Sequence, residues 1–329
     1  MTLPALAGLR SLFPTAQIDV MARPWSAPVY SFCHAADQVI EHDKPSGFAP
    51  FGKLLESAAK IKDKGYDVAL TFPNSFESAL IFRLAGIPKI YGYNTDFRST
   101  ILTRALDVPQ DKKEKHEVFY YLNLVKGLFC SDDHTWKNEL LKIKLAIPET
   151  EKQAARELLH ALGCNPDMSL IGINPGAAYG PAKCWPTEKY RQLAQDLLDT
   201  FPDAMLLVFG TRDDMEAGKM ITQPVGKRGI NLCGKTTLKQ AIAIIDDLDF
   251  MVTNDSGLMH VAAACSVPIV ALFGSTNPVT TGPWTDRALV VRHELPCSPC
   301  LNRDCPRDFI CMAGISVDEV LEACQKILQ

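Results

Sequence analysis

The stretch FMVTNDSGLMHVAAAC, residues 250–265, decides the fold, because it joins a strand to a helix through a short polar turn. The apolar run at 250–254 is typical of a strand that is buried on both faces. A helix of small residues is expected to begin at about Ser256, and its alanines allow close packing against a sheet. Strand, polar turn and helix in this order form the repeating unit of an α/β protein with a parallel sheet.

Strand and helix patterns alternate along nearly the whole chain, which predicts parallel sheets flanked by helices. The expected strands lie at 17–22, 66–72, 87–93, 169–176, 204–210, 229–234, 250–254 and 268–274. The expected helices lie at 50–65, 75–86, 116–128, 150–162, 187–200, 212–222, 236–245, 256–265 and 316–328. The alternation stops between about 131 and 150, where we expect the linker. The sequence therefore predicts two Rossmann-like domains, at 1–140 and 150–329, that face each other across a cleft.

Composition excludes several classes of protein. The chain has 329 residues, of which 22% are charged and 47% hydrophobic, as in ordinary globular domains. Its net charge of −4 argues against a general nucleic-acid binder. No stretch approaches the run of about eighteen apolar residues that a membrane-spanning helix needs. Most of its eleven cysteines are scattered singly, which is typical of small buried side chains in a reducing compartment.

The first expected element is a helix, although a Rossmann-like half normally begins with a strand. Leu3, Leu6 and Leu9 share one helical face in LPALAGLRSLF. The strand that precedes such a helix lies in the middle of its sheet. Without that strand, its neighbours leave buried backbone groups unpaired at about 1–3 kcal/mol each. We therefore expect one strand and its loop, about 15–25 residues, to precede Met1 in the complete protein.

The turn between the strand and the helix that opened this section has the features of a phosphate site. The first turn of a helix offers free N–H groups and positive potential, which stabilise an anion. Gly257 lets a ligand approach the backbone closely, while Asp255 and Ser256 cap the helix or contact the ligand. We expect His260, one turn into the helix, to be neutral and to form a hydrogen bond. With Asn254 these residues form the candidate centre of the site, although a capped helix with a packed histidine explains this segment alone equally well.

Two further strands end in polar loops of small residues. In INPGAAYGPAKCWP, residues 173–186, backbone N–H groups are exposed and Lys183 can reach a diphosphate. In ALFGSTNPVTTGPW, residues 271–284, Ser275 and Thr276 follow a buried strand. Because ligands of open α/β sheets bind beyond the carboxyl ends of the strands, these loops point to one site. The order GxxxxGK[ST] of a P-loop is absent, and no GxGxxG follows a strand, which argues against a dinucleotide oxidoreductase.

The motifs NPGAAYGPAKCWP, NDSGLMHVAAA and LFGSTNP with TGPW resemble those of the bacterial ADP-heptose:lipopolysaccharide heptosyltransferases, glycosyltransferase family 9, and most closely its type II members. The N-terminal LPALAGLRSLFPTAQIDVMARPW is similar to that family too, so the resemblance covers nearly the whole chain. It implies a GT-B fold, with an N-terminal acceptor-binding domain and a C-terminal domain that binds the ADP-sugar. It also implies transfer of heptose from ADP-heptose to the inner-core heptose of lipopolysaccharide, with inversion and without a cofactor or an essential metal.

The same resemblance implies roles for particular residues. Lys183 would contact the donor phosphates, and either Asp214 or Glu216 would contact the adenosine ribose. The diphosphate and the heptose would be surrounded by Asp255, Ser256, Gly257 and His260. An inverting transfer also needs a general base, which in this family is an aspartate in a Gly-Asp turn after the first strand. We expect that aspartate upstream of Met1, so no residue of this chain is assigned as catalytic.

Four late cysteines, spaced C-x2-C-x4-C-x5-C, raise the question of a metal. Thiolates this close in sequence can bind zinc or an iron–sulfur cluster. Their spacing fits no zinc motif cleanly, so we favour reduced thiols in a compact loop and expect no metal. The cysteines are Cys297, Cys300, Cys305 and Cys311.

The expected partners are ADP-heptose and a Kdo–lipid A acceptor that carries heptose, with no nucleic acid. The basic run at 112–115, followed by His116, is interpreted as a solvated helix start, although anionic lipid or a phosphorylated acceptor is an alternative. At about 1 kcal/mol for each basic residue, its lysines would support only loose, peripheral association with the cytoplasmic face of the inner membrane. Alternative functions are a non-catalytic ADP-sugar-binding remnant, heptosyltransferase I-type activity, or the use of another ADP- or UDP-sugar.

Overall fold

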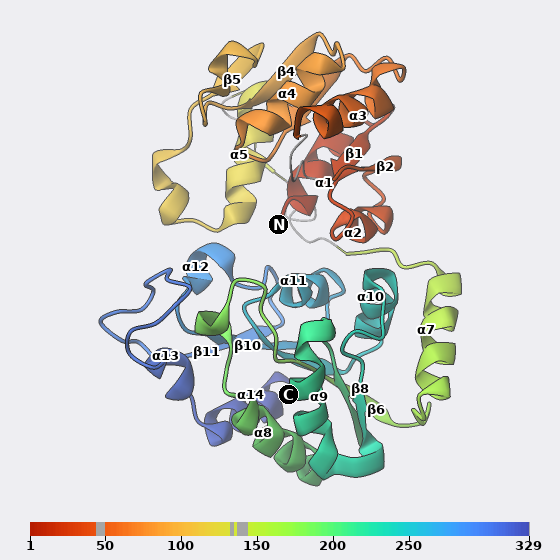
Figure 1. Ribbon diagram of the computed structural model, residues 1–329, viewed down its shortest axis with the longest axis vertical. Helices are drawn as coiled ribbons and strands as arrows, with labels where there is room; N and C mark the ends of the chain where they lie inside the picture. Colours follow the sequence, from red (N-terminus) through yellow and green to blue (C-terminus); the bar gives the residue numbers. More distant parts are fainter. Residues whose placement is uncertain (44–49, 132–134, 137–143, 329) are drawn as a thin grey trace. The chain divides into compact units, whose positions relative to one another are not determined.

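The computed structural model divides the chain into two compact units, unit 1 at residues 1–143 and unit 2 at residues 144–329 (Figure 1). The structure describes residues 1–43, 50–131, 135–136 and 144–328. Part of the expected linker, at 132–134 and 137–143, therefore lies outside the described residues.

Unit 2 contains one parallel sheet of six strands, in the spatial order β11-β10-β9-β6-β7-β8. This is the order of a doubly wound Rossmann-like sheet, in which the first strand of the unit lies in the middle. The central strands β7, β9 and β10 are buried at every position, as their apolar runs predict. The strands are β6 Ser169–Asn174, β7 Ala204–Val208, β8 Gly229–Asn231, β9 Phe250–Asn254, β10 Ile269–Phe273 and β11 Ala288–Arg292.

Two groups of helices cover this sheet (Figure 1): α8 packs against α9 and α14, while α10 packs against α7 and α11. Local signals explain where several of these helices begin. Thr237 and Gln240 close a capping box at the start of α10, and Ser316 and Glu319 do the same for α14. The helices of unit 2 are α7 Glu149–Ala161, α8 Thr187–Thr200, α9 Met215–Thr222, α10 Leu238–Asp246, α11 Gly257–Ala264, α12 Pro278–Thr281, α13 Ile310–Ala313 and α14 Val317–Ile327, with 3-10 turns η3 Pro181–Lys183, η4 Arg212–Asp214 and η5 Gln223–Arg228.

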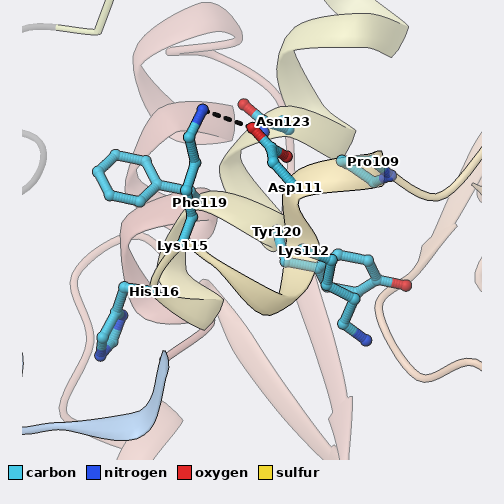
Figure 2. Close-up of a pocket in the computed structure, with 8 residues that line it drawn as sticks. All are labelled: Pro109, Asp111, Lys112, Lys115, His116, Phe119, Tyr120 and Asn123. Carbon is cyan, nitrogen blue, oxygen red and sulfur yellow. Dashed lines mark ion pairs between the residues drawn. The ribbon is translucent and has the colours of Figure 1, made fainter. Parts of the chain in front are cut away.

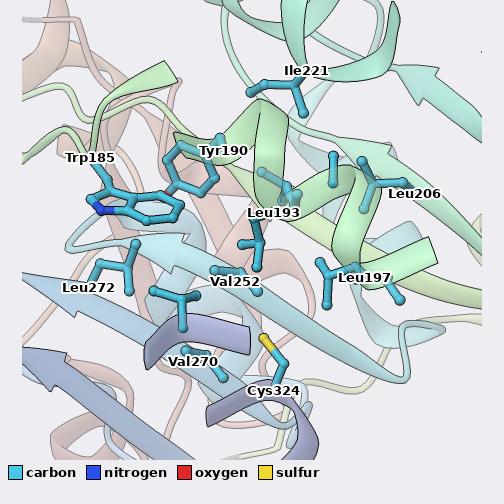
Figure 3. Packing of buried hydrophobic residues seen from close by; sticks show 14 of the residues in the cluster. Trp185, Tyr190, Leu193, Leu197, Leu206, Ile221, Val252, Val270, Leu272 and Cys324 are labelled. Atoms are coloured by element: carbon cyan, nitrogen blue, oxygen red, sulfur yellow. The ribbon is translucent and has the colours of Figure 1, made fainter. Parts of the chain in front are cut away.

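The core of unit 2 lies between α8, α14 and the sheet (Figure 3). Its largest side chain is Trp185, which is 1% exposed and packs edge-on against the ring of Tyr190 at a centroid distance of 4.8 Å. The Trp185 indole donates a hydrogen bond to the carbonyl of Ile315, 3.1 Å away. Because Trp185 directly follows the loop that carries Lys183, this core fixes the base of that loop.

Unit 1 contains two separate parallel sheets in its described part. No ladder joins β1 to β3 there, and a further strand between them stays a prediction of the sequence pattern. The first sheet pairs β1 Asp19–Ala22 with β2 Gln38–Glu41, and the second has the order β3 Val68–Thr71, β4 Lys89–Tyr93, β5 Arg104–Leu106.

The helices of unit 1 confirm the predicted positions. The N-terminal helix is present and buries Leu3 and Leu6. Ser75 caps α4 by accepting a hydrogen bond from the N–H of Ser78. The helices are α1 Leu3–Leu12, α2 Ala27–Ser31, α3 Pro50–Lys62, α4 Phe76–Leu84 and α5 Glu117–Phe129, with 3-10 turns η1 Arg98–Thr100 and η2 Gln110–Lys113. No helix in the described parts of either unit is both long and apolar enough to span a bilayer.

Candidate functional site

The candidate site lies at the carboxyl edge of the sheet in unit 2. Strands β10, β9 and β6 are consecutive neighbours in that sheet, and each ends in one of the three polar loops. Because the strands are parallel, their carboxyl ends lie on one edge and bring the loops together. The expectation that these three segments meet is therefore satisfied by the topology of the sheet.

The centre of the site is an ion pair between Lys183 and Asp255. The Nζ atom of Lys183 is 2.6 Å from Oδ2 of Asp255, and their side chains are only 14% and 5% exposed. The hydroxyl of Thr276 donates to the same carboxylate oxygen at 2.7 Å. Residues from all three loops thus converge on one carboxylate. A buried ion pair loses much of its Coulomb energy to desolvation, so an arriving phosphate can compete with Asp255 for the lysine.

Ser256 occupies the N-cap position of α11. Its Oγ accepts a hydrogen bond from the N–H of Met259 at 3.4 Å and another from Nδ2 of Asn174 at 2.8 Å. Gly257, the first helical residue, is exposed, and a Cβ atom built there would meet no protein atom within 4 Å. The helix therefore begins at an open surface, with its N–H groups close to the ion pair. His260 is half-buried in the first turn of the same helix.

Asn254 belongs to the framework of the site. It is fully buried, and its Oδ1 accepts hydrogen bonds from the hydroxyl of Tyr190 at 2.9 Å and from the N–H of Trp185 at 3.2 Å. Its Nδ2 donates to the carbonyl of Pro175 at 2.6 Å. These bonds tie the end of β9 to both ends of the loop that carries Lys183. Its expected contact with the donor stays a prediction.

Ser275 stands beside Thr276 at the end of β10. It is 2% exposed, and its Oγ has no hydrogen-bond partner among the described residues. Its backbone carbonyl accepts a hydrogen bond from the N–H of Leu301 at 2.8 Å, which attaches a distant loop to the site. A buried hydroxyl without a partner is unfavourable by about 1–3 kcal/mol, so a hydrogen bond to this hydroxyl would be favourable.

The two candidate ribose contacts follow β7. Asp214 closes a capping box in which its Oδ2 accepts from the N–H of Thr211 at 2.7 Å and from its hydroxyl at 2.8 Å. A Cβ on Gly176 would lie 2.7 Å from Oδ1 of Asp214, so the glycine gives this carboxylate room beside the loop after β6. Glu216 is exposed in the first turn of α9. Both acids therefore lie on the β7 side of the site, and their expected roles stay predictions.

The four late cysteines lie in the loop between β11 and α13 and at the start of α13. No group of three or more His, Cys, Asp or Glu side chains in the described parts of the chain is arranged to hold a metal ion. Burial raises the pKa of the Cys311 thiol, and the nearby Cys305 and Cys300 raise it further. The loop is attached to the site, because the hydroxyl of Ser298 donates to the carbonyl of Gly274 at 2.6 Å.

The sequence analysis did not single out Tyr179. Its hydroxyl donates to the carbonyl of Leu301 at 2.5 Å, and the Nζ of Lys183 lies 4.8 Å from the centre of its ring. Tyr179 therefore connects the loop after β6 to the cysteine-bearing loop. Its position within GAAYG, between small residues, is the one signal that could have identified it.

The basic run of unit 1 is largely paired within the unit (Figure 2). Lys115 forms an ion pair with Asp111 at 2.6 Å, and Lys112 lies 4.0 Å from the ring centre of Tyr120. The Nδ1 of His116 accepts the N–H of Val118 and thereby caps α5. The pocket that these side chains line has a volume of about 10 Å³, enough for one water molecule. This arrangement agrees with the interpretation of the basic run at 112–115 and His116 as the start of a helix.

Comparison with known proteins identifies one family. Residues 54–310 match glycosyltransferase family 9 (heptosyltransferase). The chain is 35% identical over 292 residues to lipopolysaccharide heptosyltransferase 2 of Escherichia coli K12, which covers 86% of this chain and 81% of that protein. It is 30% identical over 289 residues to lipooligosaccharide heptosyltransferase 2 of Haemophilus influenzae, over 86% of this chain and 82% of that protein.

Solved structures agree with this assignment. The structure of E. coli ADP-heptose LPS heptosyltransferase II matches with a TM-score of 0.79 at 31% identity, over 99% of this chain and 94% of that chain. A family 9 glycosyltransferase from Veillonella parvula, 24% identical, shares the fold with a TM-score of 0.84, over 99% of this chain and 92% of that chain. The α/β fold is therefore GT-B, as the resemblance implied. The chain belongs to glycosyltransferase family 9, the heptosyltransferases.

Proposed function

We propose that this glycosyltransferase moves L-glycero-D-manno-heptose from ADP-heptose to the inner-core heptose of lipopolysaccharide, with the donor bound at the carboxyl edge of the sheet in unit 2. The observation that carries the proposal is the cluster of Lys183, Asp255 and Thr276 beside the start of α11. A lysine, a hydroxyl and free helix N–H groups are the donors that a diphosphate needs.

The diphosphate would exchange with Asp255 as the partner of Lys183. Asp255 would then be free to accept a hydrogen bond from a hydroxyl of the sugar, since an ionised carboxylate only accepts. His260 lies one turn along the same helix and would contact the sugar or the phosphate. Ser275, which has a buried hydroxyl without a partner among the described residues, would complete the polar lining.

The two units would divide the substrates between them. The region 150–329 would bind the ADP-sugar, and the region 1–140 would bind the heptose-bearing Kdo–lipid A. Such an acceptor would place the enzyme at the cytoplasmic face of the inner membrane as a peripheral protein. The pairing of Lys115 and Lys112 within unit 1 supports only a weak electrostatic contribution from that segment.

Donor binding is tested by calorimetric titration of ADP into the wild-type chain and its variants. Lys183→Ala is expected to weaken ADP binding at least tenfold, since hydrogen bonds to charged groups contribute about 1.5–3 kcal/mol. Asp255→Ala should change the affinity for ADP less, because the lysine keeps its charge and loses both the carboxylate that positions it and the competitor for that charge. Lys219→Ala, on the exposed face of α9, is the matched control. Unchanged affinity in Lys183→Ala would refute the donor site.

Transfer is tested with ADP-heptose and heptosylated Kdo–lipid A, and the mass of the lipid product is measured by mass spectrometry. Because the general base is expected upstream of Met1, residues 1–329 alone are expected to bind the donor without a mass gain, and a chain that contains that base is expected to add one heptose. Donor binding without a mass gain when the base is present would favour the alternative of a non-catalytic ADP-sugar-binding protein. Transfer onto Kdo–lipid A that lacks heptose would indicate type I activity, and transfer from a UDP-sugar would indicate a different donor.

A further inference from the structure

The ring of Tyr179 lies near two cations from different parts of the chain. The Nζ of Lys183 is 4.8 Å from the ring centre, and Cζ of Arg303 is 5.1 Å from it. The two charges are therefore no farther apart than about 10 Å, which is roughly the Debye length at 0.1 M salt. Arg303 comes from the cysteine-bearing loop, which the donor-site motifs do not include.

The ring that holds Arg303 is itself fixed in place. The hydroxyl of Tyr179 donates to the carbonyl of Leu301 at 2.5 Å. Gly180 has a φ of +132°, and a Cβ atom there would lie 3.6 Å from the backbone oxygen of Arg303, so the two loops are in close contact. The N–H of Leu301 in turn donates to the carbonyl of Ser275 at 2.8 Å. The loop that carries Arg303 is thus attached both to the loop after β6 and to the end of β10.

The charges at the site are unequally matched. Lys183 is neutralised by Asp255 at 2.6 Å. Arg303 is exposed, and within the described ranges no carboxylate lies within ion-pair distance of its guanidinium. A diphosphate that approached the loops after β6 and β10 would therefore meet Arg303 as a cation without a carboxylate partner among the described residues.

We propose that Arg303 is a second diphosphate-binding cation of the donor site, presented by the ring of Tyr179. A guanidinium can donate two parallel hydrogen bonds to one phosphate group, and stacking on an aromatic ring restricts its orientation in advance. Lys183 must leave Asp255 before it binds the phosphates fully, whereas Arg303 has no such competitor. The inference rests on the proposed function, because it assumes that the ligand is a nucleoside diphosphate.

The test compares Arg303→Ala with Arg307→Ala, which removes the same charge from the same exposed loop. ADP and adenosine are titrated into the wild type and both variants at low and at moderate salt. We expect Arg303→Ala to weaken ADP binding about tenfold at low salt and less at moderate salt, and to leave adenosine binding unchanged. Arg307→Ala should stay within about twofold of the wild type. The ADP affinity of Arg303→Lys should lie between those of the wild type and Arg303→Ala, because lysine keeps the positive charge but lacks the planar guanidinium that can donate two parallel hydrogen bonds.

The outcomes separate this inference from the proposed function. If the wild type does not bind ADP, the proposed function fails. If it binds ADP and loses affinity in Lys183→Ala, but Arg303→Ala and Arg307→Ala behave alike, only the inference about Arg303 fails. Equal weakening of ADP and adenosine in Arg303→Ala would also overturn it, since a general disturbance of the loop would then explain the loss. Thermal unfolding of each variant checks that these exposed substitutions leave the fold intact.

The role of Tyr179 gives an independent readout. Tyr179→Phe keeps the aromatic ring and removes only the hydrogen bond to Leu301, whereas Tyr179→Leu removes the ring against which Arg303 packs. We expect ADP affinity to fall several-fold in the leucine variant and little in the phenylalanine variant. In the leucine background, a further Arg303→Ala change should have a smaller effect than in the wild type, because the arginine has lost its support. Full additivity of the two changes would contradict the proposed arrangement.

Discussion

The two units place their buried polar residues differently. In unit 2 the buried polar side chains lie at or next to the carboxyl ends of three neighbouring strands; they are Asn174, Thr253, Asn254, Asp255, Ser275 and Thr276. In the described part of unit 1 they are dispersed over a strand end, helices and turns; they are His42, Ser57, Thr71, Arg98 and His116. The difference teaches that the buried polar side chains of unit 2 are concentrated at the carboxyl ends of its strands, whereas those of unit 1 are dispersed.

Arg98 illustrates the contrast. It is fully buried in unit 1, where Nε donates to the carbonyl of Tyr93 at 2.9 Å and a terminal nitrogen donates to the carbonyl of Pro73. Burial lowers the pKa of its guanidinium. Arg98 thus ties the ends of β3 and β4 together from the inside, whereas Lys183 of unit 2 lies at the edge of its sheet, close to the surface. Buried charge serves the framework in one unit and a candidate site in the other.

The largest expected effect comes from the core of unit 2. Trp185→Ala should lower the free energy of unfolding by about 3–5 kcal/mol, because it leaves a large cavity beneath the loop of Lys183. Trp25→Ala in unit 1 is the matched control, since Trp25 is 76% exposed and its loss should change stability by less than about 0.5 kcal/mol. Urea unfolding followed by circular dichroism measures both values. Similar costs for the two tryptophans would contradict this view of the core.

A smaller effect is expected from the polar framework. Asn254→Ala should lower the free energy of unfolding by about 2–3 kcal/mol, because the hydroxyl of Tyr190 and the N–H of Trp185 lose their acceptor inside the protein. Ser57→Ala in unit 1 removes a single hydroxyl, which bonds to His42 and to the carbonyl of Lys53, and should cost about 1 kcal/mol. Urea unfolding again provides the measurement. If Ser57→Ala lowered the free energy of unfolding as much as Asn254→Ala or more, the buried polar groups at the strand ends of unit 2 would stabilise the fold no more than the dispersed polar groups of unit 1.

Much of the fold could be predicted because the buried strands and amphipathic helices leave clear patterns. The predicted helix at 187–200 is α8, and the predicted strand at 250–254 is β9. The strands β2, β5 and β11 were not predicted, and none of their residues is fully buried. Each lies at an edge of its sheet, where a strand buries fewer side chains and its hydrophobic pattern weakens.

The candidate site was less accessible to sequence reasoning, because its contacts join distant segments. The motifs located Lys183 and Asp255 correctly at the same sheet edge, since parallel strands impose that geometry. Nothing in the local sequence shows that Asn254 bonds to Tyr190, 64 positions away. Arg303 was equally hidden, because it lies outside the donor-site motifs and its contact with the ring of Tyr179 joins distant segments of the chain.

The smallest expected effect concerns a carboxylate outside the polar edge of unit 2. Glu319 accepts hydrogen bonds from the N–H and the hydroxyl of Ser316, both at 2.7 Å, and these bonds, together with His293, lower its pKa from 4.5 to about 2. Because the folded state holds this proton more weakly than the unfolded state, Glu319 contributes its full stabilisation above pH 4.5. That contribution decreases as the pH falls and is lost near pH 2.

Glu319→Gln should therefore lower the free energy of unfolding by no more than about 1 kcal/mol at pH 7, since the side chain is 45% exposed and solvent screens its charge. The difference from the wild type should shrink as the pH falls towards 2 and vanish below pH 2, where the glutamate is protonated in both states. In unit 1, Asp37 is the matched carboxylate, because the N–H of Ile18 and the guanidinium of Arg10 lower its pKa. The loss of unfolding free energy caused by Asp37→Asn should likewise become smaller as the pH falls. Urea unfolding at several pH values measures the free energy of unfolding of both variants. If Glu319→Gln lowered that free energy by the same amount at pH 2 as at pH 7, the capping geometry, and not the charge, would stabilise the start of α14.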